Sequence, residues 1–276
     1  MDTFADQPKH GRTPLDQPFF WRVADGVLYA EMPYSTSIRP PLLTQWESER
    51  AKSFNNPQRR NQWLAGRALA KALVRERLGI PGIVEIREGA SGEPLVYRNG
   101  LPMPHVWLGM GYRHGRVAAV IADRPVALDI RRVEDGSAEV VSRFVGRAEF
   151  RILRKVFRGL PLACSVAWAI KEAAIRAARG GDHPDGLLNA KVLPDFGVSV
   201  GDVRMHTLAL RVVDETVVAI VGRPLLHEKP VTRIVMSDAP STATDEQVAL
   251  SIDRSVARAR RVAEARARWH RLRWQT

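Results

Sequence analysis

Residues 105–130 read HVWLGMGYRHGRVAAVIADRPVALDI, and this stretch predicts three successive β-strands. The last two strands are joined by a turn at residues 122–125. The third strand ends near Asp129, and Arg131 follows two residues later. Because side chains of a strand alternate between its faces, the carboxylate and the guanidinium share one face. The pair is therefore a metal site, a damaged metal site or an ordinary ion pair.

Helical patterns lie on both sides of these strands in the sequence. Residues 42–80 are helical in composition and are interrupted at Asn55-Asn56-Pro57, where a second helix should begin and then end at Gly79. Another helix should run from about Ala163 to Arg179, with Gly180-Gly181 as its C-terminal stop. A set of strands with one long helix thus occurs twice along the chain.

Further turn signals complete this pattern. Asp25-Gly26 predicts a hairpin near the N-terminus, residues 85–104 predict two short strands, and Asp214-Glu215 predicts a turn between later strands. The sequence predicts an α+β fold of two similar halves with a site at their junction and an extra C-terminal helix. The expected divisions are a leader (1–18), an N-terminal half (19–124), a C-terminal half (125–227), a linker (228–248) and a basic helix (249–276).

Composition restricts the class of protein. The chain has 276 residues, 45% hydrophobic and 26% charged, which excludes disorder throughout. No apolar run is long enough to cross a membrane, and the N-terminus is unlike a signal or transit peptide, so we expect a cytoplasmic protein. Cys164 lies in a helical pattern among small and apolar residues and should be a buried structural thiol.

The charge balance favours acidic partners. Lys and Arg number 42 against 30 Asp and Glu, which gives a formal charge of +12. Part of the excess is local, because residues 254–274 contain eight arginines and one acid. The arginines of this tail surround the expected helix, for which Thr244 and Gln247 resemble a capping box. We consider contact with nucleic acid through this tail less favoured, since no recognition motif accompanies it.

Two groups of charged residues are candidates for chemistry. Arg60, Arg67 and Lys71 form one stripe of the second helix, and spacing alone favours a solvated face over a phosphate cradle. Glu172 and Arg176 are one turn apart, which by periodicity is a surface ion pair. Alternatively, Glu172 converges with Asp129, and two carboxylates with a substrate's phosphates satisfy Mg²⁺.

Several segments in order resemble a known family. Between residues 40 and 182 the chain resembles the 4′-phosphopantetheinyl transferases of the larger, two-halved type. The matching positions are Glu47, Arg50, Phe54, Gly66-Arg67, Asp129, Trp168 and Lys171-Glu172. The resemblance implies an enzyme that binds coenzyme A between two α+β halves. It would transfer the phosphopantetheine arm to a serine of an acidic acyl or peptidyl carrier protein, in polyketide, fatty-acid or peptide assembly.

The same resemblance assigns roles to individual residues. Asp129 and Glu172 would hold Mg²⁺, and Glu172 or a water that it polarises would remove the serine proton. Lys171 would be a second catalytic residue next to Glu172. The phosphates of coenzyme A would be met by the remaining cations, namely Arg60, Arg67, Lys71, Arg131 and Arg176, together with Lys171.

The chain also departs from the family pattern. Gly92-Glu93-Pro94 replaces Gly-Lys-Pro, and Gly109-Met110-Gly111 replaces Ser-His-Ser. His105 and His114 flank the second motif, but a lone histidine near a strand end is more often structural or solvated. The glycines allow close backbone approach and offer N–H groups to a phosphate. Arg176 stands in for a lysine and keeps its charge.

Arg131 stands where the family has a second acid, and three interpretations remain open. The metal could bind more weakly to Asp129 and Glu172 alone. Arg131 could instead contact phosphate oxygens directly. Finally, Arg131 could bridge the two acids in a dry network without chemistry. These alternatives give two hypotheses, a diverged transferase or a silent member of the family that binds a carrier protein.

Overall fold

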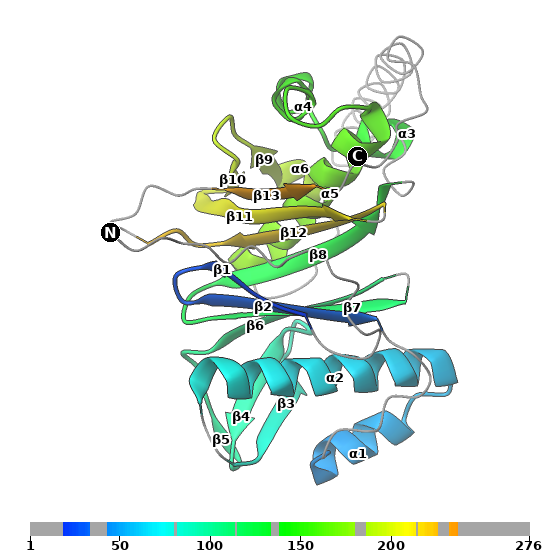
Figure 1. Ribbon diagram of the computed structural model, residues 1–276, viewed down its shortest axis with the longest axis vertical. Coiled ribbons are helices and arrows are strands. Elements are labelled where there is room, and N and C mark those ends of the chain that lie inside the picture. Colours follow the sequence, from blue (N-terminus) through cyan, green and yellow to red (C-terminus); the bar gives the residue numbers. More distant parts are fainter. Residues whose placement is uncertain are drawn as a thin grey trace, which may run out of the picture.

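The fold belongs to the α+β class, as predicted. The computed structural model describes residues 19–33, 43–79, 82–113, 115–133, 138–179, 186–213, 215–225 and 232–236. Within these ranges, helices and mostly antiparallel sheets alternate along the chain (Figure 1). The expected leader, His114, the Thr244–Gln247 box and the basic C-terminal helix lie outside the described residues.

The first sheet has the strand order β1-β2-β7-β6, and all its pairings are antiparallel. Its strands are β1 (Phe19–Ala24), β2 (Val27–Pro33), β6 (Trp107–Arg113) and β7 (Arg116–Ala122). The predicted hairpin turn at Asp25-Gly26 is confirmed, and Gly26 adopts the left-handed conformation there, with a φ of 69°. A β-carbon would be strained in that conformation, which explains the glycine.

Two helices accompany this sheet. α1 (Gln45–Lys52) begins with a capping box between Thr44 and Glu47. α2 (Pro57–Leu78) begins at Asn56, whose side chain accepts two backbone N–H bonds, and ends at Gly79 in the left-handed conformation. The predicted break and both ends of α2 are therefore confirmed. α2 packs its apolar residues against β2, β6 and β7.

A small antiparallel sheet lies beside α2 and β6. It consists of β3 (Val84–Glu88), β4 (Pro94–Arg98) and β5 (Leu101–Pro102), in that order. The two short strands predicted in this region are confirmed as β3 and β4. Their connecting loop carries Ser91 and Glu93.

The second sheet has the order β8-β12-β11-β10-β9. Its strands are β8 (Val126–Arg132), β9 (Ala190–Val192), β10 (Gly197–Val200), β11 (Val203–Val213) and β12 (Thr216–Gly222). α5 (Leu160–Arg179) covers one face, with α3 (Ala138–Val141), α4 (Arg147–Arg154) and α6 (Gly186–Asn189) nearby. α5 begins three residues before the predicted start at Ala163. Asp129 lies in the middle of β8, not at its end as predicted, because the strand continues through Arg132.

Part of the expected linker is a strand. Arg233–Met236 forms β13, which pairs in parallel with β11 beyond the segment that β10 covers. The prediction of a linker over residues 228–248 is therefore wrong for these residues. Thr232 precedes this strand and fixes its start to β11, since its hydroxyl donates to the Thr207 carbonyl at 2.7 Å.

The two sheets pack face to face, and each carries a long helix on its outer face (Figure 1). Apolar residues of β2 and β7 meet those of β8, β11 and β12 in a core between the sheets. Gly109 permits a close approach of β6 to β8, because a β-carbon there would lie 2.9 Å from the Ala127 Cα. The close approach here is that of a neighbouring strand, and the predicted approach of a phosphate to the glycines stays a prediction.

Candidate functional site

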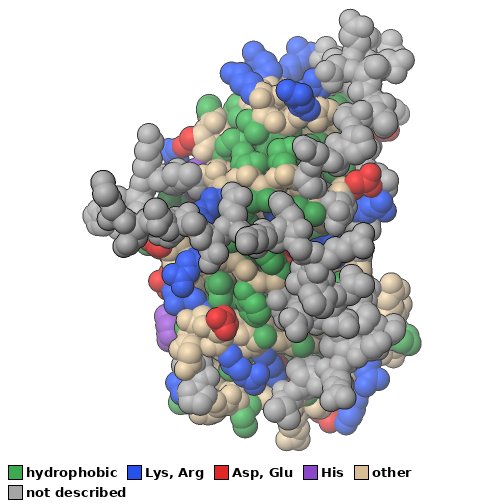
Figure 2. Space-filling model, in the orientation of Figure 1, with side chains coloured by type: hydrophobic (Ala, Val, Ile, Leu, Met, Phe, Trp, Pro, Cys, Tyr) green, Lys and Arg blue, Asp and Glu red, His purple; other side chains and the backbone are tan. Residues whose placement is uncertain are grey.

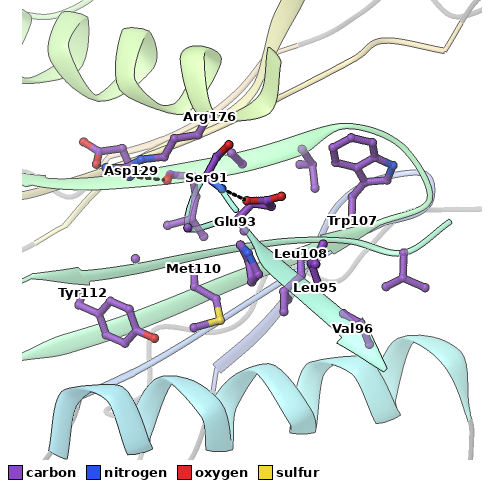
Figure 3. Close-up of a pocket in the computed structure, with 18 of the residues that line it drawn as sticks. Ser91, Glu93, Leu95, Val96, Trp107, Leu108, Met110, Tyr112, Asp129 and Arg176 are labelled. Carbon is purple, nitrogen blue, oxygen red and sulfur yellow. Dashed lines mark hydrogen bonds and ion pairs between the residues drawn. The ribbon is translucent and has the colours of Figure 1, made fainter. Parts of the chain in front are cut away.

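A cavity of about 630 Å³ opens where β4, β6, β8 and α5 meet. Residues 91–97, 102–104 and 106–113 line it from the first half of the chain, and residues 126–131 with Arg176 line it from the second. Figure 3 shows Arg176 beside Asp129, and Ser91 beside Glu93. The family resemblance predicts a site in this region, and three of its predicted residues, Asp129, Arg131 and Arg176, line the cavity wall.

Asp129 is buried and is held by two guanidinium groups. Its Oδ2 accepts from Arg131 Nε at 2.6 Å, and its Oδ1 accepts from Arg176 Nη1 at 2.9 Å. Burial raises the pKa of Asp129 above its ordinary value, and the two arginines oppose that shift without cancelling it. The prediction that Asp129 and Arg131 share a face of the strand is confirmed.

Glu172 reaches the same two arginines from α5. Its Oε1 accepts from Trp168 Nε1 at 3.3 Å and lies 3.4 Å from Arg131 Nη2. Its Oε2 lies 3.9 Å from Arg176 Nη2, so the predicted ion pair one turn apart forms, but it is partly buried and does not lie on the surface as predicted. The Arg131 guanidinium also stacks on the Trp168 ring, with its Cζ 4.3 Å from the ring centroid. We call these residues (Asp129, Arg131, Trp168, Glu172 and Arg176) the arginine network.

The arginine network matches the third interpretation of Arg131, a bridge between the two acids. All four carboxylate oxygens face a guanidinium group, and the formal charges of the two acids and two arginines add to zero. Mg²⁺ prefers carboxylate oxygens with excess negative charge. The described residues contain no group of three or more acidic, histidine or cysteine side chains able to hold a metal ion. This set of ligands does not fit Mg²⁺, so the predicted ion lacks support from the geometry.

Lys171 does not face the cavity. It is buried beneath α4, where its Nζ lies 3.0 Å from Glu149 and donates to the Phe144 carbonyl. Burial lowers the pKa of Lys171, and Glu149 opposes that shift. Glu149 also accepts the backbone N–H groups of Gly146 at 2.8 Å and Val192 at 2.7 Å. Lys171 therefore joins α5 to the start of α4 and to β9.

The stripe on α2 divides into one exposed and two buried cations. Arg60 is exposed, but Arg67 and Lys71 are buried, so the interpretation of the stripe as a solvated face is wrong for those two. Lys71 binds Glu47, whose Oε1 accepts the Ile86 N–H at 3.1 Å. Arg67 stacks on Trp63 and lies 3.5 Å from Glu88. The three cations are absent from the cavity lining.

The two altered motifs do line the cavity. In the first, the Glu93 carboxylate accepts the Ser91 N–H at 2.9 Å, so it caps its own loop (Figure 3). In the second, Gly109 and Gly111 face β8, where side chains would collide with Ala127 and Leu128. His105, a candidate to replace the missing imidazole, is exposed and outside the lining.

Sequence reasoning missed three partners that hold these residues. Trp168 precedes Glu172 by four positions, which is the helical spacing that brings its indole to the carboxylate. Glu149 follows Gly146 by three positions, the spacing of a capping box, and this signal could have identified it. Glu88 binds Arg50 and Arg67 from a separate sheet, and no local pattern indicates that contact.

Comparison with known proteins does not assign the chain to a group. No protein-family model matches the chain, and no curated protein matches its sequence. Among the described helices, none is both long enough and apolar enough to cross a membrane.

Proposed function

We propose that this chain is a silent relative of the 4′-phosphopantetheinyl transferases, which binds an acidic carrier protein without transferring the phosphopantetheine arm. The observation that carries the proposal is the arginine network. Transfer needs a metal or an equivalent charge at the diphosphate and a free base for the serine proton. Glu172 instead shares its oxygens with Trp168 and two arginines, and the network has no net charge.

The connectivity supports the proposed kinship. Strands β2-β7-β6 and β8-β12-β11 are ordered alike, and in each sheet the long helix follows the first of these strands in sequence. Near each long helix, a glutamate at the third position of a shorter helix binds a buried lysine. These pairs are Glu47 with Lys71 and Glu149 with Lys171. Both glutamates also accept a backbone N–H of a strand, which supports two similar halves.

A cationic surface supports docking of an acidic carrier. Arg147, Arg151 and Lys155 lie at positions i, i+4 and i+8 of α4 and its C-terminal cap, and all three are exposed. Figure 2 shows Lys and Arg side chains grouped at the end of the molecule where Figure 1 places α4. Complementary charge of this kind accelerates association and selects acidic partners.

The test combines chemistry and binding. Incubation with coenzyme A, Mg²⁺ and a panel of apo acyl and peptidyl carrier proteins should leave every carrier's intact mass unchanged. A carrier of the panel should still bind in calorimetry, and the double variant Arg147→Glu/Arg151→Glu should weaken that binding at least tenfold. The matched control is Arg59→Glu/Arg75→Glu on α2, which makes the same charge change at exposed positions and should leave binding unchanged.

Two results would overturn the proposal. Addition of phosphopantetheine that disappears in Glu172→Gln would make the chain an active transferase. Failure of the whole panel to bind would remove the docking role.

A further inference from the structure

The cavity beside the arginine network has mainly apolar walls. Strand β4, the segment before β6 and the start of β6 supply Leu95, Val96, Met103, Pro104, Trp107 and Leu108. Figure 3 shows Leu95, Leu108 and Trp107 together on the side of the cavity away from Tyr112. A volume of about 630 Å³ lies within the usual range of small-molecule sites, roughly 300–1,000 Å³.

The charges that line the cavity do not suit a nucleotide with several phosphates. Glu93 and Asp129 oppose Arg113, Arg131 and Arg176 in the lining, and Glu172, which contacts Arg131 and Arg176 from α5, brings the formal sum to zero. Glu93 lines the cavity at the position where the family that the chain resembles has a lysine. Arg131 and Arg176 already balance Asp129 and Glu172. A polyphosphate would therefore be desolvated here without enough compensating charge.

We propose that this cavity binds an acyl chain, an elongated apolar ligand with no more than one negative charge, such as a fatty-acid carboxylate. The chain would lie along the apolar wall from β4 to β6, and the carboxylate would lie at the arginine end. The guanidinium groups that line the cavity, those of Arg113, Arg131 and Arg176, are hydrogen-bond donors suited to such a head group. This inference does not depend on carrier docking, because the cavity and the α4 surface involve different residues.

A chain-length series provides the first test. Binding of octanoate, decanoate and laurate would be measured by calorimetry below the concentrations at which they form micelles, with coenzyme A as the comparison. Burial of each methylene contributes about 0.8 kcal/mol, so affinity should rise about fourfold for each added methylene. Coenzyme A should bind more weakly than laurate. Equal affinities along the series, or tighter binding of coenzyme A, would overturn the proposal.

A pair of substitutions tests whether laurate binds in this cavity. Leu95 lines the cavity and is 39% exposed, whereas Leu101 is 71% exposed and outside the lining. Leu95→Asp should weaken laurate binding at least tenfold, since it introduces a carboxylate on the wall that contacts the chain. Leu101→Asp should leave the affinity unchanged. Circular dichroism and melting temperature should match the unaltered protein in both variants. Equal effects of the two substitutions would show that laurate does not enter this cavity.

Discussion

Replacement of Arg131 by methionine tests whether the arginine network is an integral part of the fold. The side chains of Arg131 and Asp129 are 10% and 6% exposed, so their ion pair is almost fully buried. Arg131→Met keeps most of the side-chain volume but leaves Asp129 with Arg176 alone. Loss of one partner from a buried pair destabilises by about 3–5 kcal/mol. At roughly 2–4 °C per kcal/mol for domains of 150–250 residues, the melting temperature should fall by about 6–20 °C.

The stability that Arg131→Met loses should also depend on pH. Burial already raises the pKa of Asp129, so the folded protein holds this proton more tightly than the unfolded chain does. Stability from this group is therefore present below its ordinary pKa and is lost as the pH rises through the folded value. Removing the Arg131 charge raises the folded pKa of Asp129 further. The free energy of unfolding that Arg131→Met loses, measured with urea, should thus be larger at pH 8 than at pH 5.

Arg132 provides the matched control on the same strand. Its side chain is 38% exposed and lies 3.5 Å from Glu215, which is 59% exposed. Arg132→Met should cost less than about 1 kcal/mol, with little change between pH 5 and 8. The reasoning would be refuted if Arg131→Met cost no more than Arg132→Met, or if its deficit were the same at both pH values.

Three further outcomes follow from the buried contacts. Lys171→Met should lower the free energy of unfolding by about 3–5 kcal/mol in urea, because the Glu149 carboxylate loses its cation; a loss below 1 kcal/mol would contradict this. Gly109→Ser should lower it by about 1–3 kcal/mol in thermal melts, since its β-carbon would lie 2.9 Å from the Ala127 Cα; an unchanged melt would refute the close packing. Burial raises the pKa of the Cys164 thiol to about 12, so iodoacetamide at pH 8 should modify it only in denaturant, and rapid labelling of the native protein would disprove its burial.

The elements that could be predicted from sequence are those with local signals. Asn56 and Gly79 mark the ends of α2 because capping and the left-handed conformation depend on neighbouring backbone groups. Asp25-Gly26 similarly specifies its own hairpin. The prediction of a buried Cys164 is also confirmed, since a thiol among small apolar residues of a helix has no polar alternative.

Other features depend on partners distant in sequence. Helical spacing places Arg67 and Lys71 on one stripe, but their burial is decided by Glu88 and Glu47, which come from other elements. A charged stripe is solvated by default, and only paired cations enter a core. Strand β13 is missed for a related reason, because its pairing with β11 joins two segments that no short-range pattern connects.

The arginine network shows how one spacing supports opposite chemistries. Positions 129 and 131 face the same side of β8, and α5 places Glu172 opposite them, so an acid at position 131 would complete a set of three carboxylates. An arginine there reverses one charge and fills the space between the acids. An acid at position 131 would still leave Arg176 bound to Asp129 at 2.9 Å. A set of metal ligands at these positions would therefore require a change of both arginines together.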